Sequence, residues 1–453
     1  MNRRNFLKFG SASLATAATL SSLNVLANES ASNSDDYKAL VCVFLYGGMD
    51  NYDTIIPFDD VSYQGWAAIR APLLSRYATS RTQSNLHALN TPARFGARKF
   101  ALAPEMTQLA ALYNQGNMAI VGNVGPLLAP TQRAMIEANT ASLPARLFSH
   151  NDQQSTWMSG SPEGAQFGWA GKISDALVQG NIANDSPFSA ITMSSGELLI
   201  TGEQTAPYHL IGGNPADITV LKGVSGDLKA QLEQHFAATG EHASNLLKQD
   251  MIAKQQSAYH ANALYKSSVS SNTETTTAFP NSFLGQQLAS VANVISSHQQ
   301  LGTNRQVFMV TLGGFDTHSD QARELPELQT TLDQAIGAFA SELQANGLFD
   351  KVTLFTASDF GRTLAVNGDG TDHGWGSHHF VMGGAVNGGT IYGDLPPAEF
   401  DHSLDVGGGR LIPTISTEQY AANFASWMGV NETEINALFP TLGEFGERPD
   451  FMM

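Results

Sequence analysis

Cysteine is almost absent from this sequence of 453 residues, and positive charge is scarce. The single cysteine, Cys42, lies within the apolar run LVCVFLY, so no intramolecular disulfide can form and a buried small hydrophobe is favoured over a reactive thiol. Lys and Arg total 24 against 41 Asp and Glu, which gives a formal net charge of −17. Because nucleic-acid binding needs clustered cationic side chains, this balance argues against a nucleic-acid partner. A polyanionic substrate fits only a site that is itself cationic, for example through a bound metal.

The sequence also lacks a long apolar run of the kind that spans a membrane. Its first 27 residues combine Arg3-Arg4, a short Ala/Ser/Leu stretch and the small-residue segment Val25-Leu26-Ala27. This arrangement is typical of a twin-arginine signal peptide, and the apolar part is too short and too rich in Ser and Thr for a span. We therefore predict export by the twin-arginine machinery to a periplasmic or extracellular location, no integral membrane span, and a disordered lead-in over residues 28–38.

Three short apolar runs predict the core of the fold. Ala39–Tyr46, Val307–Leu312 and Val352–Phe355 have the length and the β-branched content of buried parallel strands. The segment Leu325–Leu348 has helical spacing and connects the second and third runs, as in a right-handed β–α–β unit. The fold class predicted from these features is α/β, with a doubly wound, mostly parallel sheet flanked by helices.

A change of character in the middle of the chain predicts an insertion. Residues 187–279 contain short strand-like pieces, then a long helix-compatible segment, Leu228–Tyr265, and then the polar run SSVSSNTETTT. We interpret this region as a helical cap inserted between two halves of the core, residues 39–186 and residues 280–453.

Acids and histidines follow the predicted strands. The turn Gly47-Gly48-Met49-Asp50 after the first run has the same pattern as Gly313-Gly314-Phe315-Asp316 after the second. In an open α/β sheet, ligands gather at the carboxyl ends of the strands, and carboxylates with imidazoles are what a divalent metal needs. We predict a site for zinc, manganese, magnesium or calcium. Its candidate ligands are Asp50, Asp316, His318, Asp359, Asp372, His373 and His378.

Other residues are candidates for a direct part in catalysis. Ser149 and His150 stand before a predicted helix start, where Ser149 is either a nucleophile or a helix cap and His150 is a candidate proton carrier. Arg362 is placed to clamp an anionic oxygen, to pair with Asp359, or to do both. A metal at this site would polarise an ester oxygen, so these residues point to metal-assisted hydrolysis.

Several of these motifs together resemble the bacterial secreted family called domain of unknown function 1501. The resemblance is carried by Arg3-Arg4, Gly47-Gly48-Met49-Asp50, the run LFSHNDQQSTW, Gly314-Phe315-Asp316-Thr317-His318, Ser358-Asp359-Phe360-Gly361-Arg362-Thr363 and Asp372-His373-Gly374. That family is considered similar to the alkaline phosphatase and sulfatase superfamily. The resemblance implies an alkaline phosphatase-like sheet, metal ligation by Asp50 and by the later Asp and His sets, and a nucleophile at a helix start, which corresponds to Ser149.

The sequence departs from that superfamily in three respects. The superfamily's adjacent Asp-His pair usually ends a strand, whereas the strand-ending acid here, Asp359, is followed by Phe360. One ligand pair is spaced Asp316-x-His318 instead of Asp-x-x-x-His, and no Cys/Ser-x-Pro-x-Arg motif occurs, so formylglycine chemistry is not expected. Two functions follow as hypotheses. The first is an exported metal-dependent hydrolase of phosphate or sulfate esters, acting on a small-molecule or polysaccharide substrate. The second is a non-catalytic secreted protein that uses the same fold to bind a glycan or an envelope partner.

Overall fold

The computed structural model describes residues 36–194, 196–216, 219–237, 245–269 and 275–453. The chain divides into two units, residues 1–36 and residues 37–453, and the second unit holds the helices and strands described below. The predicted signal peptide, residues 1–27, and most of the predicted lead-in, residues 28–38, lie outside the described residues. Among the described residues, no helix is both long enough and apolar enough to cross a membrane.

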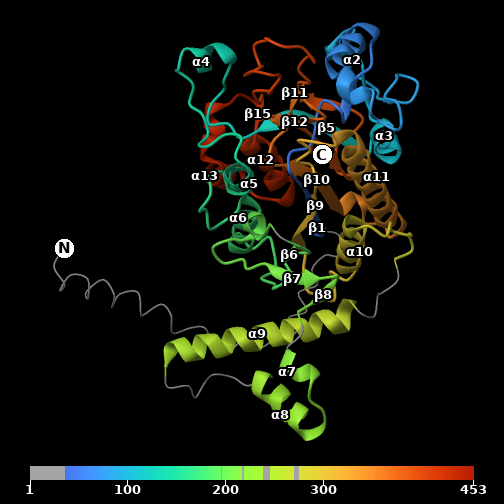
Figure 1. The fold of residues 1–453 in the computed structure, drawn as a ribbon. Coiled ribbons are helices and arrows are strands. Elements are labelled where there is room, and N and C mark those ends of the chain that lie inside the picture. Colours follow the sequence, from blue (N-terminus) through green and yellow to red (C-terminus); the bar gives the residue numbers. More distant parts are fainter. Residues whose placement is uncertain (1–35, 195, 217–218, 238–244, 270–274) are drawn as a thin grey trace, which may run out of the picture. The chain divides into compact units, whose positions relative to one another are not determined.

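A central sheet is the main feature of the second unit (Figure 1). In spatial order its strands are β14 (Ile391–Gly393), β5 (Met118–Gly125), β13 (Ser377–Met382), β10 (Val352–Ser358), β1 (Lys38–Tyr46), β9 (Arg305–Gly313), β6 (Ala190–Thr192), β7 (Tyr208–Ile211) and β8 (Asn214–Pro215), and β15 (Ile415–Ser416) pairs with β5. Most neighbours are parallel, whereas β13 is antiparallel to both β10 and β5, and β8 is antiparallel to β7. The predicted mostly parallel sheet is confirmed.

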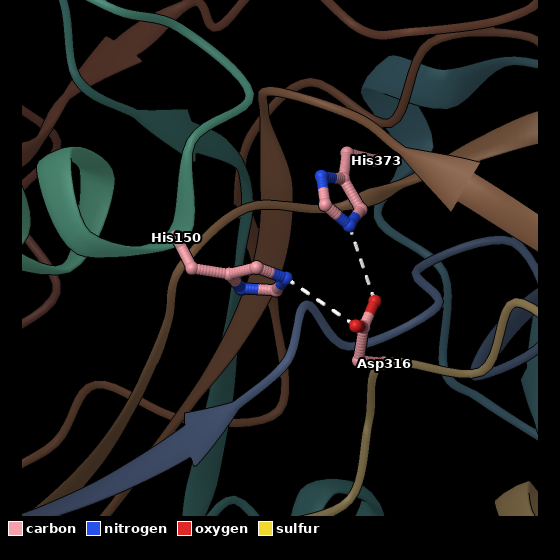
Figure 2. Close-up of side chains that lie close together, drawn as sticks. All are labelled: His150, Asp316 and His373. Atoms are coloured by element: carbon pink, nitrogen blue, oxygen red, sulfur yellow. Dashed lines mark hydrogen bonds and ion pairs between the residues drawn. The ribbon is translucent and has the colours of Figure 1, made fainter.

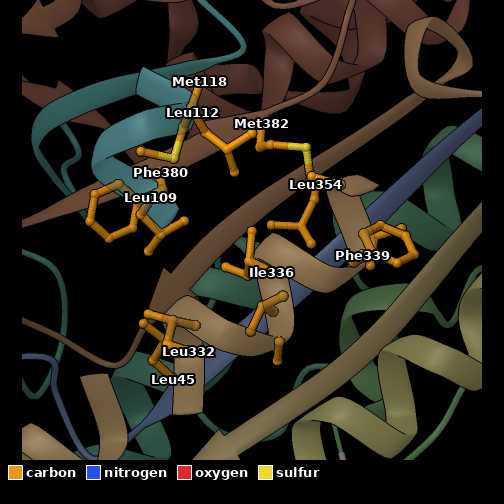
Figure 3. Packing of buried hydrophobic residues seen from close by; sticks show 14 of the residues in the cluster. Leu45, Leu109, Leu112, Met118, Leu332, Ile336, Phe339, Leu354, Phe380 and Met382 are labelled. Carbon is orange, nitrogen blue, oxygen red and sulfur yellow. The ribbon is translucent and has the colours of Figure 1, made fainter. Parts of the chain in front are cut away.

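Helices cover both faces of this sheet. The helices on one face are α3 (Thr107–Asn114), α10 (Phe283–Ser296) and α11 (Gln321–Ala345), and those on the other are α5 (His150–Ser159), α6 (Trp169–Gln179), α12 (Thr417–Met428) and α13 (Glu432–Leu438) (Figure 1). Strand β1 separates the two layers, because its side chains alternate between them: Val41 and Val43 pack in the first core, and Leu40 and Phe44 in the second. Figure 3 shows part of the first core, where Ile336 of α11 lies near Leu354 of β10 and Leu332 of α11 lies near Leu45 of β1.

Smaller elements surround the carboxyl end of the sheet. They are α2 (Asp60–Leu74), a sheet in the order β2 (Ile55–Pro57), β4 (Phe100–Leu102) and β3 (His87–Ala88), α4 (Arg133–Glu137), and the hairpin of β11 (Arg362–Asn367) with β12 (Gly370–His373). Short 3-10 turns lie at Ala93–Phe95, Glu197–Ile200, Phe349–Lys351 and Pro440–Glu444. Cys42 is fully buried and unpaired, and burial raises the pKa of its thiol, which agrees with the predicted hydrophobic role.

The region predicted as an inserted cap differs from the prediction in its strands. Strands β6, β7 and β8, within residues 187–279, belong to the central sheet, so only the helices after them lie outside that sheet. These helices are α7 (Thr219–Lys222), α8 (Gly226–Ala237) and α9 (Leu246–Val269). The predicted helix-compatible segment Leu228–Tyr265 holds two described helices, α8 and α9, and residues 238–244 lie outside the described residues. Part of the predicted polar linker, residues 270–274, lies outside the described residues.

Candidate metal centre

The three central strands end at the same level, which brings their loops together. Leu45 of β1 is in register with Leu312 of β9 and with Ser358 of β10. The loops that carry Asp50, Asp316 and Asp359 therefore begin side by side at the carboxyl edge. Because that edge is where ligands gather in open α/β sheets, the location agrees with the prediction from sequence.

Gly47 allows the loops after β1 and β9 to touch. Its φ is +113°, a left-handed conformation that favours glycine, and a Cβ at this position would lie 2.3 Å from the backbone nitrogen of Asp316. The backbone of Phe315 also donates to the carbonyl of Tyr46 at 3.1 Å. Asp316 is thus fixed against the end of β1.

Three imidazoles converge on the carboxylate of Asp316. Its Oδ1 lies 3.1 Å from His318 Nε2 and 3.2 Å from His373 Nε2, and its Oδ2 lies 3.4 Å from His150 Nε2. The Nε2 atoms of His318 and His373 are 2.9 Å apart. Figure 2 shows His150 and His373 approaching Asp316 from different elements, α5 and β12.

The other ring nitrogen of each histidine faces an acceptor. His150 Nδ1 lies 2.6 Å from Asp359 Oδ2, and His318 Nδ1 lies 3.3 Å from Asp372 Oδ1. His373 Nδ1 lies 2.9 Å from the backbone carbonyl of Phe148, which can only accept. The acceptors of His150 and His373 assign the proton to Nδ1 in each of these rings when neutral, so their Nε2 atoms present lone pairs toward Asp316. Both ring nitrogens of His318 face carboxylates, Asp372 at Nδ1 and Asp316 at Nε2.

This donor set fits a borderline divalent cation. Tetrahedral zinc with ligands at about 2.0–2.1 Å places neighbouring ligand atoms roughly 3.3–3.4 Å apart. The recorded separations run from 2.9 Å, between His318 and His373, to 3.4 Å, between His150 and Asp316. The ligand atoms of His150, Asp316 and His373 all lie within 4.8 Å of one another, and His318 is outside this mutual group and contacts only Asp316 and His373 of it. Acceptors behind metal-ligating histidines are also the usual arrangement in metal sites.

The electrostatics of the cluster suit ligation at neutral pH. Burial lowers the pKa of His373 and favours its neutral, ligating form. Burial raises the pKa of Asp316, but the hydrogen bond and charge of Arg362, with smaller effects of His318 and His150, lower it overall, so Asp316 stays ionised. The hydrogen bond to Asp359 raises the pKa of His150 above its ordinary value. A bound cation would compete with that proton.

Arg362 is buried and holds the carboxylate of Asp316 by a hydrogen bond. Its side chain is fully buried, and its Nη1 donates to Asp316 Oδ1 at 2.8 Å and to the carbonyl of Gly47 at 3.2 Å. Its Nε and Nη2 donate to the hydroxyl and the carbonyl of Thr371. The predicted alternative of an ion pair with Asp359 is not what the contacts give, because the partner is Asp316. These contacts leave little of the guanidinium for a substrate.

Two predicted ligands lie behind the cluster. Asp359 is fully buried and accepts from Gln154 Nε2 at 2.8 Å in addition to its contact with His150. Asp372 accepts from Asn367 Nδ2 at 3.0 Å, and this bond is the main cause of its lowered pKa. Both carboxylates hold a histidine from the far side of its ring.

Two others lie away from the cluster. Asp50 Oδ1 accepts from Arg70 and from the backbones of Tyr52 and Asp53, and Oδ2 accepts from Arg70 and Gln321. A carboxylate offers about four acceptor sites, so none is left for a metal. His378 is buried on β13, accepts from the backbone of Asn123 at 2.9 Å, and has its pKa lowered by burial to about 4.

Ser149 occupies the N-cap position of α5, directly before His150. Its hydroxyl donates to Asp152 Oδ2 at 2.8 Å, and no side-chain capping bond to the helix is formed. Asp152 also pairs with Arg146 at 3.2 Å. The position at a helix start agrees with the sequence-based expectation, whereas the roles of nucleophile and of proton carrier for His150 stay predictions.

Sequence reasoning missed the residues that orient the histidines. Phe148 holds His373 with its carbonyl and has a φ of +71°, which is unusual for a bulky residue and keeps that carbonyl in place. Gln154 lies one helical turn after His150 and could have been found from that spacing. Arg410, which donates to the carbonyl of His373 at 2.8 Å, carries no signal in the sequence beyond its Gly-rich neighbours.

Comparisons with known proteins add three solved structures that this chain is similar to. The PsFucS1 sulfatase from Pseudoalteromonas sp. is 10% identical, with 92% of this chain and 73% of that chain covered and a TM-score of 0.37. The C-terminal periplasmic domain of EcEptC from Escherichia coli is 10% identical, with 91% and 88% covered and a TM-score of 0.34. The phosphonate monoester hydrolase SpPMH from Silicibacter pomeroyi is 7% identical, with 87% and 74% covered and a TM-score of 0.34.

These are likenesses only, and the interpretation of the site rests on its own residues. No curated protein matches the chain. A family model does match, over residues 37–407, and its description is "Protein of unknown function (DUF1501)". The family predicted from the sequence motifs is therefore confirmed, and the chain belongs to the DUF1501 family.

Proposed function

We propose that this chain is an exported, metal-dependent hydrolase of phosphate or sulfate esters. One observation carries the proposal: three histidines, each held at Nδ1 by an acceptor, direct Nε2 toward the single carboxylate of Asp316. Without a cation, the lone pairs of the neutral His150 and His373 rings would face the Asp316 carboxylate at 3.2–3.4 Å. A divalent ion, of which zinc fits the donors best, removes that repulsion.

The residues have distinct roles in this proposal. His150, His318, His373 and Asp316 would hold the ion, which supplies a Lewis acid that polarises an ester oxygen. Arg362 fixes Asp316, and Asp359 keeps the proton of His150 on Nδ1. Ser149 is the proposed nucleophile, since it stands at the start of α5 directly before a ligand.

The overall charge limits the classes of substrate that the protein can attract. With a formal net charge of −17, long-range attraction of a polyanion is unfavourable, so the cation of the site itself would have to bind the ester anion. A small-molecule ester, or a polysaccharide with isolated ester groups, fits that condition. The twin-arginine signal pattern of residues 1–27 supports a periplasmic or extracellular location.

The first test is metal content. We expect the purified protein to contain a stoichiometric divalent ion, and His373→Ala and Asp316→Ala to lose it. His209→Ala is a matched control, because His209 is a half-exposed histidine that also pairs with an acid, Glu197, at 3.6 Å but has no second imidazole beside it in the described chain. Metal-free protein that fails to take up added zinc, manganese, magnesium or calcium would contradict the proposal.

A second test separates the enzyme from a binding protein. The hydroxyl of Ser149 donates to Asp152 and makes no recorded contact with the cluster among the described residues, which favours a secreted glycan- or envelope-binding protein as the alternative. For the enzyme we expect Ser149→Ala to abolish hydrolysis of aryl phosphates or aryl sulfates and to leave metal content unchanged. A metal-loaded wild type that turns over neither ester class would favour the alternative.

A further inference from the structure

A buried chain of hydrogen bonds connects the Asp50–Arg70 ion pair to the metal centre. Its middle member is Gln321, the first residue of α11, which is fully buried. The amide Nε2 of Gln321 donates to Asp50 Oδ2 at 2.7 Å. Its Oε1 accepts from the hydroxyls of Thr371 at 2.8 Å and of Thr317 at 3.1 Å.

These partners leave the amide one orientation. Asp50, which Arg70 contacts with two guanidinium nitrogens, is an acceptor, so Nε2 of Gln321 must face it. The carbonyl oxygen of the amide must then face the two threonines. A hydroxyl has a single proton, and the proton of Thr371 is directed to Gln321, so its lone pairs face the Nε of Arg362 at 3.2 Å.

We infer that Gln321 is a positioning residue for the metal centre: through the hydroxyl of Thr371 it sets the guanidinium of Arg362, which in turn holds Asp316. The inference rests on the proposed metal site. Gln321 itself touches neither the proposed metal nor a substrate. The side-chain amide of Gln321 thereby orients the carboxylate of Asp316, the proposed metal ligand.

The same helix supplies a matched control. Gln329 is also buried, lies two turns further along α11, and bridges the neighbouring segment with the carbonyl of Asp53 at 3.0 Å and the hydroxyl of Thr54 at 3.1 Å. Its Oε1 accepts from Arg81 at 2.9 Å. Among the described residues, no hydrogen bond joins Gln329 to Thr371 or Arg362. Gln321→Met and Gln329→Met therefore remove equally buried amides, and only the first cuts the link to Asp316.

The test is Co²⁺ affinity of the full-length protein, measured by competition with a chelator, with urea unfolding used to establish that each variant is folded. We expect Gln321→Met to bind Co²⁺ about 10–100-fold more weakly, as for lost supporting contacts in metal sites, and Gln329→Met to bind as the wild type does. Thr371→Val should reproduce the loss, and adding it to Gln321→Met should weaken binding no further. Equal affinities for the two methionine variants would overturn the inference.

A second measurement does not depend on metal. The Nε–H of Arg362, assigned by its absence in Arg362→Lys, should exchange slowly with solvent in the wild type and in Gln329→Met, and fast in Gln321→Met. A wild type that binds no Co²⁺ yet shows this exchange pattern would contradict the proposed function and support the role of Gln321. Slow exchange retained in Gln321→Met would overturn that role, whatever the metal content.

Discussion

Two aspartates that follow the same Gly-Gly turn differ in their partners. Asp50, after β1, is 1% exposed and is held by Arg70 of α2 at 2.7 Å. Asp316, after β9, has a side chain that is 43% exposed and faces three histidines. The difference comes from what packs above each turn: α2 delivers a buried guanidinium over the first, and the β11–β12 hairpin delivers an imidazole to the second.

The first prediction concerns this buried ion pair. Asp50→Asn removes the nearer of two carboxylates around the buried Arg70 guanidinium, and Asp53 at 3.5 Å stays as its other partner, so the free energy of unfolding should fall by up to about 3–5 kcal/mol. A double-mutant cycle with Arg70→Met, measured by urea denaturation, should give a favourable coupling of about 1–3 kcal/mol. The exposed pair Arg76–Asp369, at 3.2 Å, is the control and should give less than about 1 kcal/mol. Equal couplings for the two pairs would contradict the assignment.

The second prediction concerns pH. Burial lowers the pKa of His378 to about 4 and of His379 to about 3, well below the ordinary value of 6.5. Above pH 6.5 these two histidines are neutral in both the folded and the unfolded chain. Below pH 6.5 they bind protons in the unfolded chain but stay neutral in the folded chain. The free energy of unfolding should therefore fall by up to about 1.4 kcal/mol per pH unit for each histidine, from pH 6.5 down to pH 4 and below.

A substitution tests this slope. The His379 ring packs against Trp157 with centroids 4.9 Å apart, and its Nε2 has no hydrogen-bond partner among the described residues. His379→Phe should therefore keep the packing and remove one titrating group. Urea midpoints at pH 7, 6 and 5 should show a shallower acid loss for His379→Phe than for the wild type. His209→Phe, at a half-exposed position, is the control for removing an imidazole outside the core. The same slope in all three proteins would rule the explanation out.

At the scale of elements, the turn after β1 restricts how the metal site can assemble. Gly47→Ala places a Cβ 2.3 Å from the backbone nitrogen of Asp316, so we expect the loop that carries Asp316 to move and Co²⁺ affinity to fall by about tenfold or more. Gly116→Ala separates strain from displacement, because Gly116 also has a positive φ, +83°, but no atom lies near its would-be Cβ. Both variants should lose about 1–3 kcal/mol of stability. Unchanged Co²⁺ binding in Gly47→Ala would contradict this account.

The elements differ in how well their sequences predict them. The runs Ala39–Tyr46 and Val307–Leu312 are strands because continuous apolar residues are buried on both faces, and the structure extends them by only one to three residues. The capping box of Ser416 and Gln419 likewise opens α12 as its sequence indicates. The segment Leu228–Tyr265 shows one continuous helical spacing of apolar residues, so its sequence does not separate the two described helices α8 and α9.

Long-range partners explain the remaining misses at the site. The carbonyl of Phe148 holds His373 across 225 positions in the sequence, and any residue has a carbonyl, so no residue type marks that contact. The local pattern predicts Asp50 as a metal ligand, but Arg70 occupies its carboxylate. The approach of Arg70 depends on how α2 packs, which the local pattern does not show. The strand ends and most of the histidines could be found from local patterns, whereas the hydrogen bonds that divide ligands from supporting residues depend on tertiary structure.

For the molecule as a whole, the site joins segments that folding alone brings together. His150, Asp316 and His373 come from α5, from the loop after β9 and from β12, so the unfolded chain has no preformed arrangement of these ligands. A cation that binds the folded chain in preference to the unfolded one must stabilise it by mass action. Binding of the proposed cation and global stability would therefore be linked.

The last prediction follows from that linkage. At a free Zn²⁺ concentration of 100 times Kd, the free energy of unfolding should exceed its value in EDTA by about 2.7 kcal/mol. The difference should vanish in His373→Ala and persist in His209→Ala, since only the first removes a ligand. Urea unfolding of each protein, with Zn²⁺ and with EDTA, measures this directly. A Zn²⁺ effect of equal size in both variants would mean that the ion binds elsewhere, and the cluster around Asp316 would then have to be stabilised by protons on its histidines.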